Sequence, residues 1–262
     1  MENMIRKQLD QNLIIRSNRK IASDVYEMVL EGNTELITAP GQFINISLPG
    51  LFLRRPISIC DWDEDKLTII YKVVGKGTDA MSSLQEEFSL NCLMGLGNGF
   101  DISLTGDNVL LVGGGVGTPP MYGLAKKLLK AGKQIRVILG FNSRCDAFYI
   151  DEFKKLEKIS GSPIDIKIST VDGTLGIKGF VTDCIGDFEN VTDYCACGPI
   201  PMLKALFRYF KNSIPGQLSF EERMGCGFGA CVGCSIKTAS GNKKVCKDGP
   251  VFLSSEVAQI LS

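Results

Sequence analysis

Four cysteines near the C-terminal end have a spacing that could hold an iron-sulfur centre. Cys226, Cys231 and Cys234 form a C-x4-C-x2-C run, and Cys246 follows after eleven intervening residues. This is the spacing of a plant-type 2Fe-2S cluster site. Three thiolates can converge from one loop only if the chain turns tightly, which glycine allows. The glycines of this loop are Gly225, Gly227, Gly229 and Gly233. The pattern therefore predicts a loop that wraps a 2Fe-2S cluster.

Two other uses of these cysteines are possible on the residues alone. A structural zinc site would also take four cysteines, although zinc modules usually present two separated pairs. Disulfides require an oxidising compartment, but the N-terminus leads into polar sequence rather than into an apolar signal-peptide core. We therefore expect the ten cysteines to be reduced thiols of a cytoplasmic protein. Five outside the run are expected to be small packed hydrophobic residues: Cys60, Cys92, Cys145, Cys184 and Cys195.

The composition limits the classes of function. The chain has 262 residues with 29 basic and 29 acidic side chains, and it has no basic block. Nothing in this balance favours nucleic acid or a membrane surface as a partner, and no apolar run approaches the ~20 residues of a membrane span. Histidine is absent, which removes the commonest general acid and base. We accordingly assign no catalytic acid or base.

The hydrophobic pattern changes once along the chain. Residues 13–104 show short runs with period-two alternation, broken by turn signals such as Pro40-Gly41 and Pro49-Gly50. This pattern predicts an antiparallel sandwich or barrel. From residue 108 onward the pattern predicts strands at 109–112, 135–139, 164–169, 193–196 and 217–220, and helices at 119–131, 150–158 and 202–210. Alternating strands and helices indicate a doubly wound parallel sheet.

The last segment differs from both of these parts. From residue 221 onward it shows little periodicity and few apolar residues, so we expect metal binding to supply much of its order. The expected architecture is α+β multidomain. It has an antiparallel β-barrel domain at 1–105, a doubly wound α/β domain at 106–220 and a small C-terminal cluster-binding segment at 221–262.

Two loops of the α/β part could bind a nucleotide. The first follows a buried strand and opens a helix with two prolines, so its backbone N–H groups can face a phosphate. Its glycines are Gly113, Gly114, Gly115 and Gly117. Tight strand-to-helix turns also use glycine, and the G-x-G-x-x-G spacing is missing. The second loop, Cys197-Gly198-Pro199, lies between a predicted strand and a predicted helix, where open α/β sheets place ligands. Together the two loops favour a nucleotide site.

An arginine-rich stretch in the first part admits two interpretations. Arg54 and Arg55 precede Pro56-Ile57-Ser58 in a predicted strand, and an exposed charged strand edge would explain them. A flavin site would also use these residues, with arginine facing a diphosphate and serine bonding to the flavin ring. Ile70-Tyr71-Lys72 and Gly77-Thr78 add a further cation, a ring that could stack and backbone donors.

The order of these motifs resembles the ferredoxin reductase superfamily. Across essentially the whole chain, the motifs resemble those of electron-transfer subunits of class 1B dihydroorotate dehydrogenases. They are L-R-R-P-I-S-I, G-L-G-N-G-F, G-G-G-V-G-x-P-P-x-Y, C-G-P-x-P-M-L-K-A, E-E-R-M-G-C-G-x-G-A-C and V-C-K-D-G-P-V-F.

This resemblance implies roles for the motif residues. FAD would be held by Arg55, Pro56, Ile57, Ser58, Ile70, Tyr71, Lys72, Gly77 and Thr78. NAD would be received at residues 113–120 and 197–199, and the cluster would be ligated by Cys226, Cys231, Cys234 and Cys246. Arg144 could meet a 2′-phosphate, so NADP remains open.

The resemblance also implies a function. A flavin can take two electrons from NADH and pass them on singly, which suits a one-electron iron-sulfur centre. The chain would then exchange electrons with a partner subunit that holds FMN and oxidises dihydroorotate to orotate in pyrimidine biosynthesis, in a heterotetramer with two copies of each subunit. The alternatives are a reductase subunit of a ferredoxin- or sulfite-reducing complex, or a non-enzymatic zinc-binding interaction module.

Overall fold

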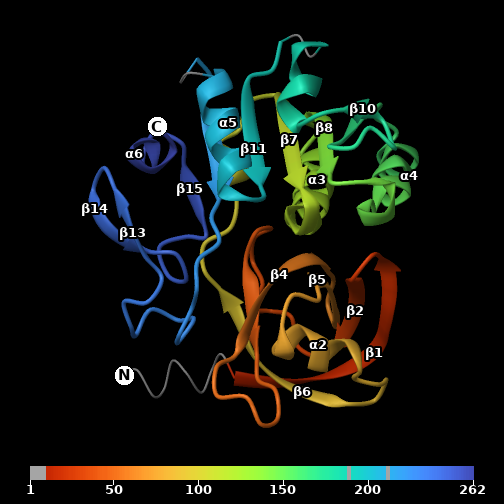
Figure 1. The fold of residues 1–262 in the computed structure, drawn as a ribbon, viewed down its shortest axis with the longest axis vertical. Coiled ribbons are helices and arrows are strands. Elements are labelled where there is room, and N and C mark those ends of the chain that lie inside the picture. The colour runs from red at the N-terminus through yellow and green to blue at the C-terminus, as the bar shows by residue number, and fades with distance from the viewer. Residues whose placement is uncertain (1–9, 188–189, 211–212) are drawn as a thin grey trace.

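The first part of the molecule is a closed antiparallel barrel (Figure 1). The computed structural model describes residues 10–187, 190–210 and 213–262. The barrel strands are β1 (Asp10–Ala22), β2 (Val25–Glu31), β3 (Phe43–Ile46), β4 (Arg55–Trp62), β5 (Lys66–Lys72) and β6 (Ser89–Leu96). They close in the order β1-β2-β5-β4-β3-β6, and helix α2 (Lys76–Ser82) lies between β5 and β6 in the chain. Alternate strand residues such as Ile44, Ile46 and Ile69 fill the interior.

The second part is a seven-stranded sheet in the order β10-β9-β8-β7-β11-β12-β15. Its strands are β7 (Asn108–Gly114), β8 (Gln134–Phe141), β9 (Asp165–Thr170), β10 (Ile177–Lys178), β11 (Asp193–Cys197), β12 (Gly216–Ser219) and β15 (Val251–Leu253). All neighbouring pairs are parallel except β12 with β15. The four residues Val109 to Val112 are wholly buried, as expected for a central parallel strand that is covered on both faces.

Helices cover both faces of this sheet. They are α3 (Thr118–Lys130), α4 (Ile150–Ser160) and α5 (Ile200–Phe210), with 3-10 helices η1 (Ile102–Leu104), η2 (Gly115–Gly117), η3 (Arg144–Asp146) and η4 (Val181–Asp187). Helices α3 and α4 pack on the face that presents Val109 and Leu111. Helix α5 and η4 pack on the opposite face, with Leu110 and Val112. The predicted doubly wound sheet is confirmed.

The barrel and the sheet meet along helix α3 and strand β4. A Cβ atom on Gly123 of α3 would lie 2.5 Å from the carbonyl oxygen of Cys60 in β4, so only glycine permits this approach. Lys126 of the same helix forms an ion pair with Asp61. Barrel residues such as Ile70 also enter the core beneath α3. The first helix of the sheet is thus fixed against the strand that carries the Arg-Pro-Ile-Ser motif.

The C-terminal segment lies beside both larger parts (Figure 1). It contains the hairpin β13 (Ser235–Thr238) and β14 (Gly241–Lys244), then β15, and helix α6 (Ala258–Leu261). The expectation that this segment buries few apolar residues is wrong. The core beside α5 includes Cys234, Ile236, Val245, Cys246, Phe252, Val257 and Leu261.

Most sequence-based expectations about the elements agree with the structure. The predicted helices and strands of the α/β part are found within two residues of the observed bounds. One of the packed-cysteine expectations is wrong, because Cys145 lies exposed in η3, whereas Cys60, Cys92, Cys184 and Cys195 are buried. Within the described residues, no helix is long and apolar enough to cross a membrane.

Candidate functional site

The four cysteines of the C-terminal segment lie in two pairs. The backbone N–H of Cys231 donates to Cys226 Sγ at 3.4 Å, and the N–H of Cys246 donates to Cys234 Sγ at 3.5 Å. Among the described residues, no group of three or more His, Cys, Asp or Glu side chains is arranged to hold a single metal ion. A 2Fe-2S centre instead distributes four thiolates over two irons. Four thiols arranged as two pairs therefore fit the two irons of such a cluster.

Backbone amides prepare one of these cysteines to act as a thiolate. Burial raises the pKa of Cys226, but N–H groups of Cys231 and Phe228 stabilise the thiolate and lower its pKa to about 7. For Cys246, burial and the neighbouring thiol of Cys234 raise the pKa to about 12. Because a metal ligand must be deprotonated, binding a metal centre would release the proton of Cys246.

Glycines shape the loop around the cysteines. A Cβ atom on Gly225 would lie 3.4 Å from Cys231 Sγ. Gly229 adopts a positive φ of 92°, and Lys244 Nζ donates to its carbonyl oxygen at 2.6 Å. The glycines therefore allow the thiols to face one another while the loop backbone remains tied to β14.

The Arg-Pro-Ile-Ser motif lies at the start of β4, beside the beginning of α2. A Cβ atom on Gly77 would lie 1.9 Å from Arg55 Nε, so the helix backbone abuts the guanidinium group. Thr78 Oγ1 accepts hydrogen bonds from the N–H groups of Val74 and Gly75 at 2.9 and 3.3 Å. The structure thus brings Arg55, Gly77 and Thr78 together from two elements. A fixed cation beside a helix N-terminus fits a diphosphate.

The two arginines of the motif have different surroundings. Arg54 donates to the backbone oxygens of Asn45 and Asn91 at 3.2 and 3.3 Å, so its guanidinium group binds barrel backbone. Arg55 bonds to backbone oxygens of its own loop, including that of Leu53. Pro56, Ile57 and Ser58 are half-buried along β4. Of the two arginines, Arg55 alone remains available beside Gly77.

Strand β5 contributes less to this site than the sequence suggests. The ring of Tyr71 is 2% exposed, stacks on Tyr26 at 5.8 Å, and its hydroxyl donates to Asn18 at 2.9 Å. The expectation that this ring is available for stacking on a flavin is therefore wrong, because the ring fills the barrel interior. Ile70 points to the core under α3. Lys72 Nζ lies 3.7 Å from Asp146 in η3.

A cavity of about 490 Å³ lies at the carboxyl ends of β7, β8 and β9. Gly114, Gly115 and Pro199 line it, so the two predicted loops meet at one site, and Lys72 reaches it from the barrel. A Cβ atom on Gly117 would lie 2.1 Å from the carbonyl oxygen of Cys197. The two loops are therefore in backbone contact beside the cavity.

The other predicted residues of these loops lie just below or beside the cavity. A Cβ atom on Gly113 would meet Thr118 at 2.8 Å, and one on Gly198 would meet the Met202 side chain at 2.5 Å. Burial raises the pKa of Cys197 to about 12, so it stays a protonated thiol. Cys197 ends β11 and is half-buried beside the glycine loop.

Sequence reasoning missed several residues of the cavity. Ser169 is the next-to-last residue of β9, and its buried Oγ has no hydrogen-bond partner among the described residues. Such an atom in a cavity wall fits a polar ligand. Phe141, Phe180 and Met202 give the cavity its apolar surface. Ser169 could have been found from the rule that strand ends of an open sheet face the ligand.

Arg144 lies outside the cavity lining. Its side chain is exposed, and its Nε donates to the carbonyl oxygen of Thr174 at 3.1 Å. Its backbone N–H donates to Thr174 Oγ1 at 2.8 Å. Asp172 in turn accepts hydrogen bonds from the backbone N–H and hydroxyl of Thr174 at 2.9 and 2.7 Å.

Comparison with solved structures defines the class of protein. The structure of an NADH-dependent reduced ferredoxin-NADP oxidoreductase superposes with a TM-score of 0.81 at 31% identity, covering 93% of this chain and 88% of that one. Phthalate dioxygenase reductase shares the fold, with a TM-score of 0.68, 18% identity, and coverage of 90% and 89% of the two chains. The fold is that of the ferredoxin reductase superfamily.

Comparison with curated proteins then gives the family. Residues 221–258 match the family model of the iron-sulfur cluster binding domain of dihydroorotate dehydrogenase B, and residues 111–207 match the oxidoreductase NAD-binding domain. A protein of Fusobacterium nucleatum is 42% identical over 94% of this chain and 98% of its own length. One of Bacillus pumilus is 44% identical over 94% and 97%. Both are named dihydroorotate dehydrogenase B (NAD(+)), electron transfer subunit, and the present chain belongs to this family.

Proposed function

We propose that the chain carries electrons between NAD(H) and a partner subunit through FAD and a 2Fe-2S cluster, and that the partner oxidises dihydroorotate to orotate. The main support for this proposal is that the three candidate sites, which are the nucleotide cavity, the Arg55 site and the cysteine loop, lie next to one another. The nucleotide cavity includes Lys72, the last residue of β5, while β3 and β4 connect the Arg55 site to the cysteine loop. Three redox groups in such a series would form a continuous path.

The cavity at the sheet edge would receive the nicotinamide nucleotide. The N–H groups of Gly114, Gly115 and Gly117 precede helix α3 and can face phosphate oxygens. Ser169 Oγ offers an uncommitted polar atom, and Cys197-Gly198-Pro199 closes the opposite side. The position of Arg144, bonded to Thr174 and outside the cavity lining, favours NAD over NADP.

The barrel edge would hold FAD. Arg55 supplies the cation for the diphosphate, and the N-terminus of α2 at Gly77 and Thr78 supplies backbone N–H groups. Pro56, Ile57 and Ser58 would border the flavin ring along β4, and Ile70, Tyr71 and Lys72 would contribute backbone and the Lys72 cation. When bound, the flavin converts a two-electron hydride into single electrons.

Cys226, Cys231, Cys234 and Cys246 would ligate the cluster, which passes electrons on. The relatives are named as electron transfer subunits, which supports a separate catalytic subunit. We infer that this subunit holds FMN and supplies the base for dihydroorotate, since the chain has no histidine and no assigned catalytic base. We further propose that two copies of each subunit form a heterotetramer in the cytoplasm. The chain itself would divide into three domains, with boundaries after residues 105 and 220.

The test is anaerobic purification followed by quantification of flavin, iron and acid-labile sulfide, with visible spectra during additions of NADH and then NADPH. We expect one FAD, two irons and two sulfides per chain, and bleaching by NADH. Protein that is colourless and holds one zinc would contradict the proposal. Copurification with a larger iron-sulfur subunit, rather than a flavoprotein, would favour a ferredoxin- or sulfite-reducing complex.

A further inference from the structure

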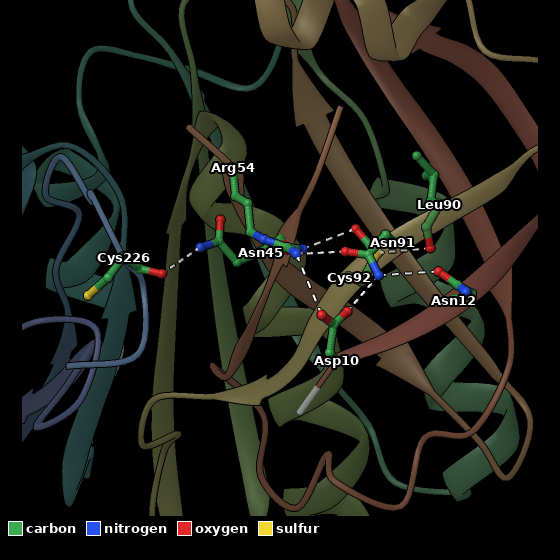
Figure 2. A network of polar contacts seen from close by, with 8 residues as sticks. All are labelled: Asp10, Asn12, Asn45, Arg54, Leu90, Asn91, Cys92 and Cys226. Carbon is green, nitrogen blue, oxygen red and sulfur yellow. Dashed lines mark hydrogen bonds and ion pairs between the residues drawn. The ribbon is translucent and has the colours of Figure 1, made fainter. Parts of the chain in front are cut away.

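Asn45 connects the barrel to the first cysteine of the cluster loop. It lies in β3 opposite Pro56 of the Arg-Pro-Ile-Ser motif. Its Nδ2 donates to the carbonyl oxygen of Cys226 at 3.3 Å (Figure 2). The two residues are 181 positions apart in the chain. One side chain thus joins the strand pair of the proposed flavin site to the backbone of a proposed cluster ligand.

An amide is unexpected at this position. Phe43, two residues earlier on the same face of β3, packs into the core that contains Cys234 and Cys246. Asn45 is only 1% exposed, and its Oδ1 has no hydrogen-bond partner among the described residues. Burying a half-satisfied amide costs free energy that an apolar side chain would avoid. The hydrogen bond to the carbonyl of Cys226 therefore satisfies only the Nδ2 group of this amide.

The cysteine loop also fits closely around this side chain. A Cβ atom on Gly227 would lie 2.2 Å from Asn45 Nδ2. Gly227 is buried and adopts a positive φ of 79°. The loop therefore passes over Asn45 with backbone alone.

Asn45 is itself anchored on its other side. Arg54 Nη1 donates to the backbone oxygen of Asn45 at 3.2 Å, and Nη2 donates to Asn91 Oδ1 at 2.6 Å. Asp10 lies 3.9 Å from the same guanidinium group and accepts from Asn91 Nδ2 at 2.5 Å (Figure 2). The Arg54 side chain is 17% exposed. A partly buried, paired cation thus holds the backbone from which Asn45 reaches the cysteine loop.

We propose that Asn45 is a positioning residue for electron transfer, which fixes the Cys226 end of the cluster against the flavin strand pair and tunes the cluster potential. This inference rests on the proposed function, which supplies the flavin and the cluster. With both groups bound, one electron from the reduced flavin would convert one ferric iron of the cluster to ferrous and would add one negative charge to the cluster. The Asn45 amide directs an N–H group at the backbone of Cys226. This N–H dipole favours the reduced form, because hydrogen bonds and dipoles near a cluster contribute to its potential.

The test compares Asn45→Ala and Asn45→Asp with Asn98→Ala. Asn98 provides a matched control, because its Nδ2 donates to the carbonyls of Lys247 and Asp248 at 3.2 Å each and so holds the other end of the cysteine segment. The readouts are the cluster midpoint potential, the EPR spectrum of the reduced cluster, and the rate of cluster reduction after NADH reduces the flavin. Wild type that lacks FAD or iron overturns the proposed function before any variant is compared.

We expect both Asn45 variants to retain FAD, iron and sulfide. Their potential should shift to more negative values, further in Asn45→Asp because of its added charge, with altered EPR g values and several-fold slower cluster reduction. Asn98→Ala should keep the wild-type potential and spectrum. Unchanged potentials in the Asn45 variants, or an equal shift in Asn98→Ala, would overturn the inference. If Asn45→Ala does not fold, the isosteric Asn45→Asp carries the same comparison.

Discussion

The backbone of Gly77 lies directly against the guanidinium group of Arg55, so that a Cβ atom on Gly77 would come 1.9 Å from Arg55 Nε. A methyl group at this position must displace the arginine side chain. In Gly77→Ala we expect FAD to bind more weakly, because the cation would no longer face the diphosphate. Loss of one charge-assisted hydrogen bond, about 1.5–3 kcal/mol, predicts a fall in affinity of roughly tenfold to 100-fold. Titration of FAD into flavin-free protein measures this change.

Gly75 provides the control for that substitution. It is the N-cap residue of α2, two positions before Gly77, and has an extended conformation with a φ of 179°. A Cβ atom added there would have no heavy atom of the described residues within 4 Å. Gly75→Ala should therefore bind FAD as wild type does. Equal FAD affinity in the two variants would remove Arg55 from the flavin site.

A substitution at Gly117 tests the nucleotide site. A Cβ atom on Gly117 would lie 2.1 Å from the carbonyl oxygen and 2.4 Å from the carbonyl carbon of Cys197, both backbone atoms that cannot rotate away. Gly117→Ala should separate the glycine loop from Cys197-Gly198-Pro199. We expect slower flavin reduction by NADH, on the order of 10-fold to 100-fold, because small displacements of a bound reactant are costly.

Flavin and iron contents should be unchanged in Gly117→Ala, since both groups would bind elsewhere. Gly186→Ala, at a site where no heavy atom of the described residues lies within 4 Å of the added carbon, should react as wild type does. Wild-type rates of flavin reduction by NADH in Gly117→Ala would show that the contact between the two loops is not needed for NADH.

The sequence predicts which segments bear chemistry more readily than which way their side chains point. Period-two alternation places Tyr71 and Ile70 on opposite faces of β5, but both faces are buried, so the pattern does not show that the Tyr71 ring faces the barrel interior. Arg54 and Arg55 are likewise neighbours in the sequence. Only the fold shows that Arg54 binds barrel backbone while Arg55 lies beside Gly77.

Pairing between residues far apart in the chain explains why the sequence does not predict strand β15 or the contact between Asn45 and Cys226. Strand β15 has three residues and pairs antiparallel with β12, so Phe252 is buried opposite Leu218. Three residues are too few to show a periodic pattern. The pairing that buries this strand involves residues more than 30 positions earlier, so the local sequence does not reveal it. The contact between Asn45 and Cys226 is not visible in the sequence for the same reason.

Removal of the cluster should loosen the cysteine loop without unfolding the C-terminal segment. In Cys231→Ser we expect loss of iron and rapid amide exchange in residues 221–234. The edge around β15 should stay protected, because Phe252 and Leu261 remain packed beside α5 and the Phe220 N–H donates to Pro250 at 2.8 Å. Hydrogen exchange measured by mass spectrometry distinguishes the two regions. Simultaneous exchange of all residues from 221 to 262 would show that the cluster orders the whole segment.

The turn that holds Arg144 should depend on pH through Asp172. Hydrogen bonds from the backbone N–H and hydroxyl of Thr174 stabilise the carboxylate and lower the pKa of Asp172 below its ordinary value. A carboxyl group whose pKa is depressed by folding stabilises the folded turn at neutral pH, and this contribution is lost as the pH falls through the folded pKa. Thr174→Ala should raise the Asp172 pKa part of the way, because the backbone donor remains. Carbon-13 NMR titration of the carboxyl group measures both values. Wild-type Asp172 titrating at its ordinary pKa, or an unchanged pKa in Thr174→Ala, would mean that these hydrogen bonds do not persist in solution.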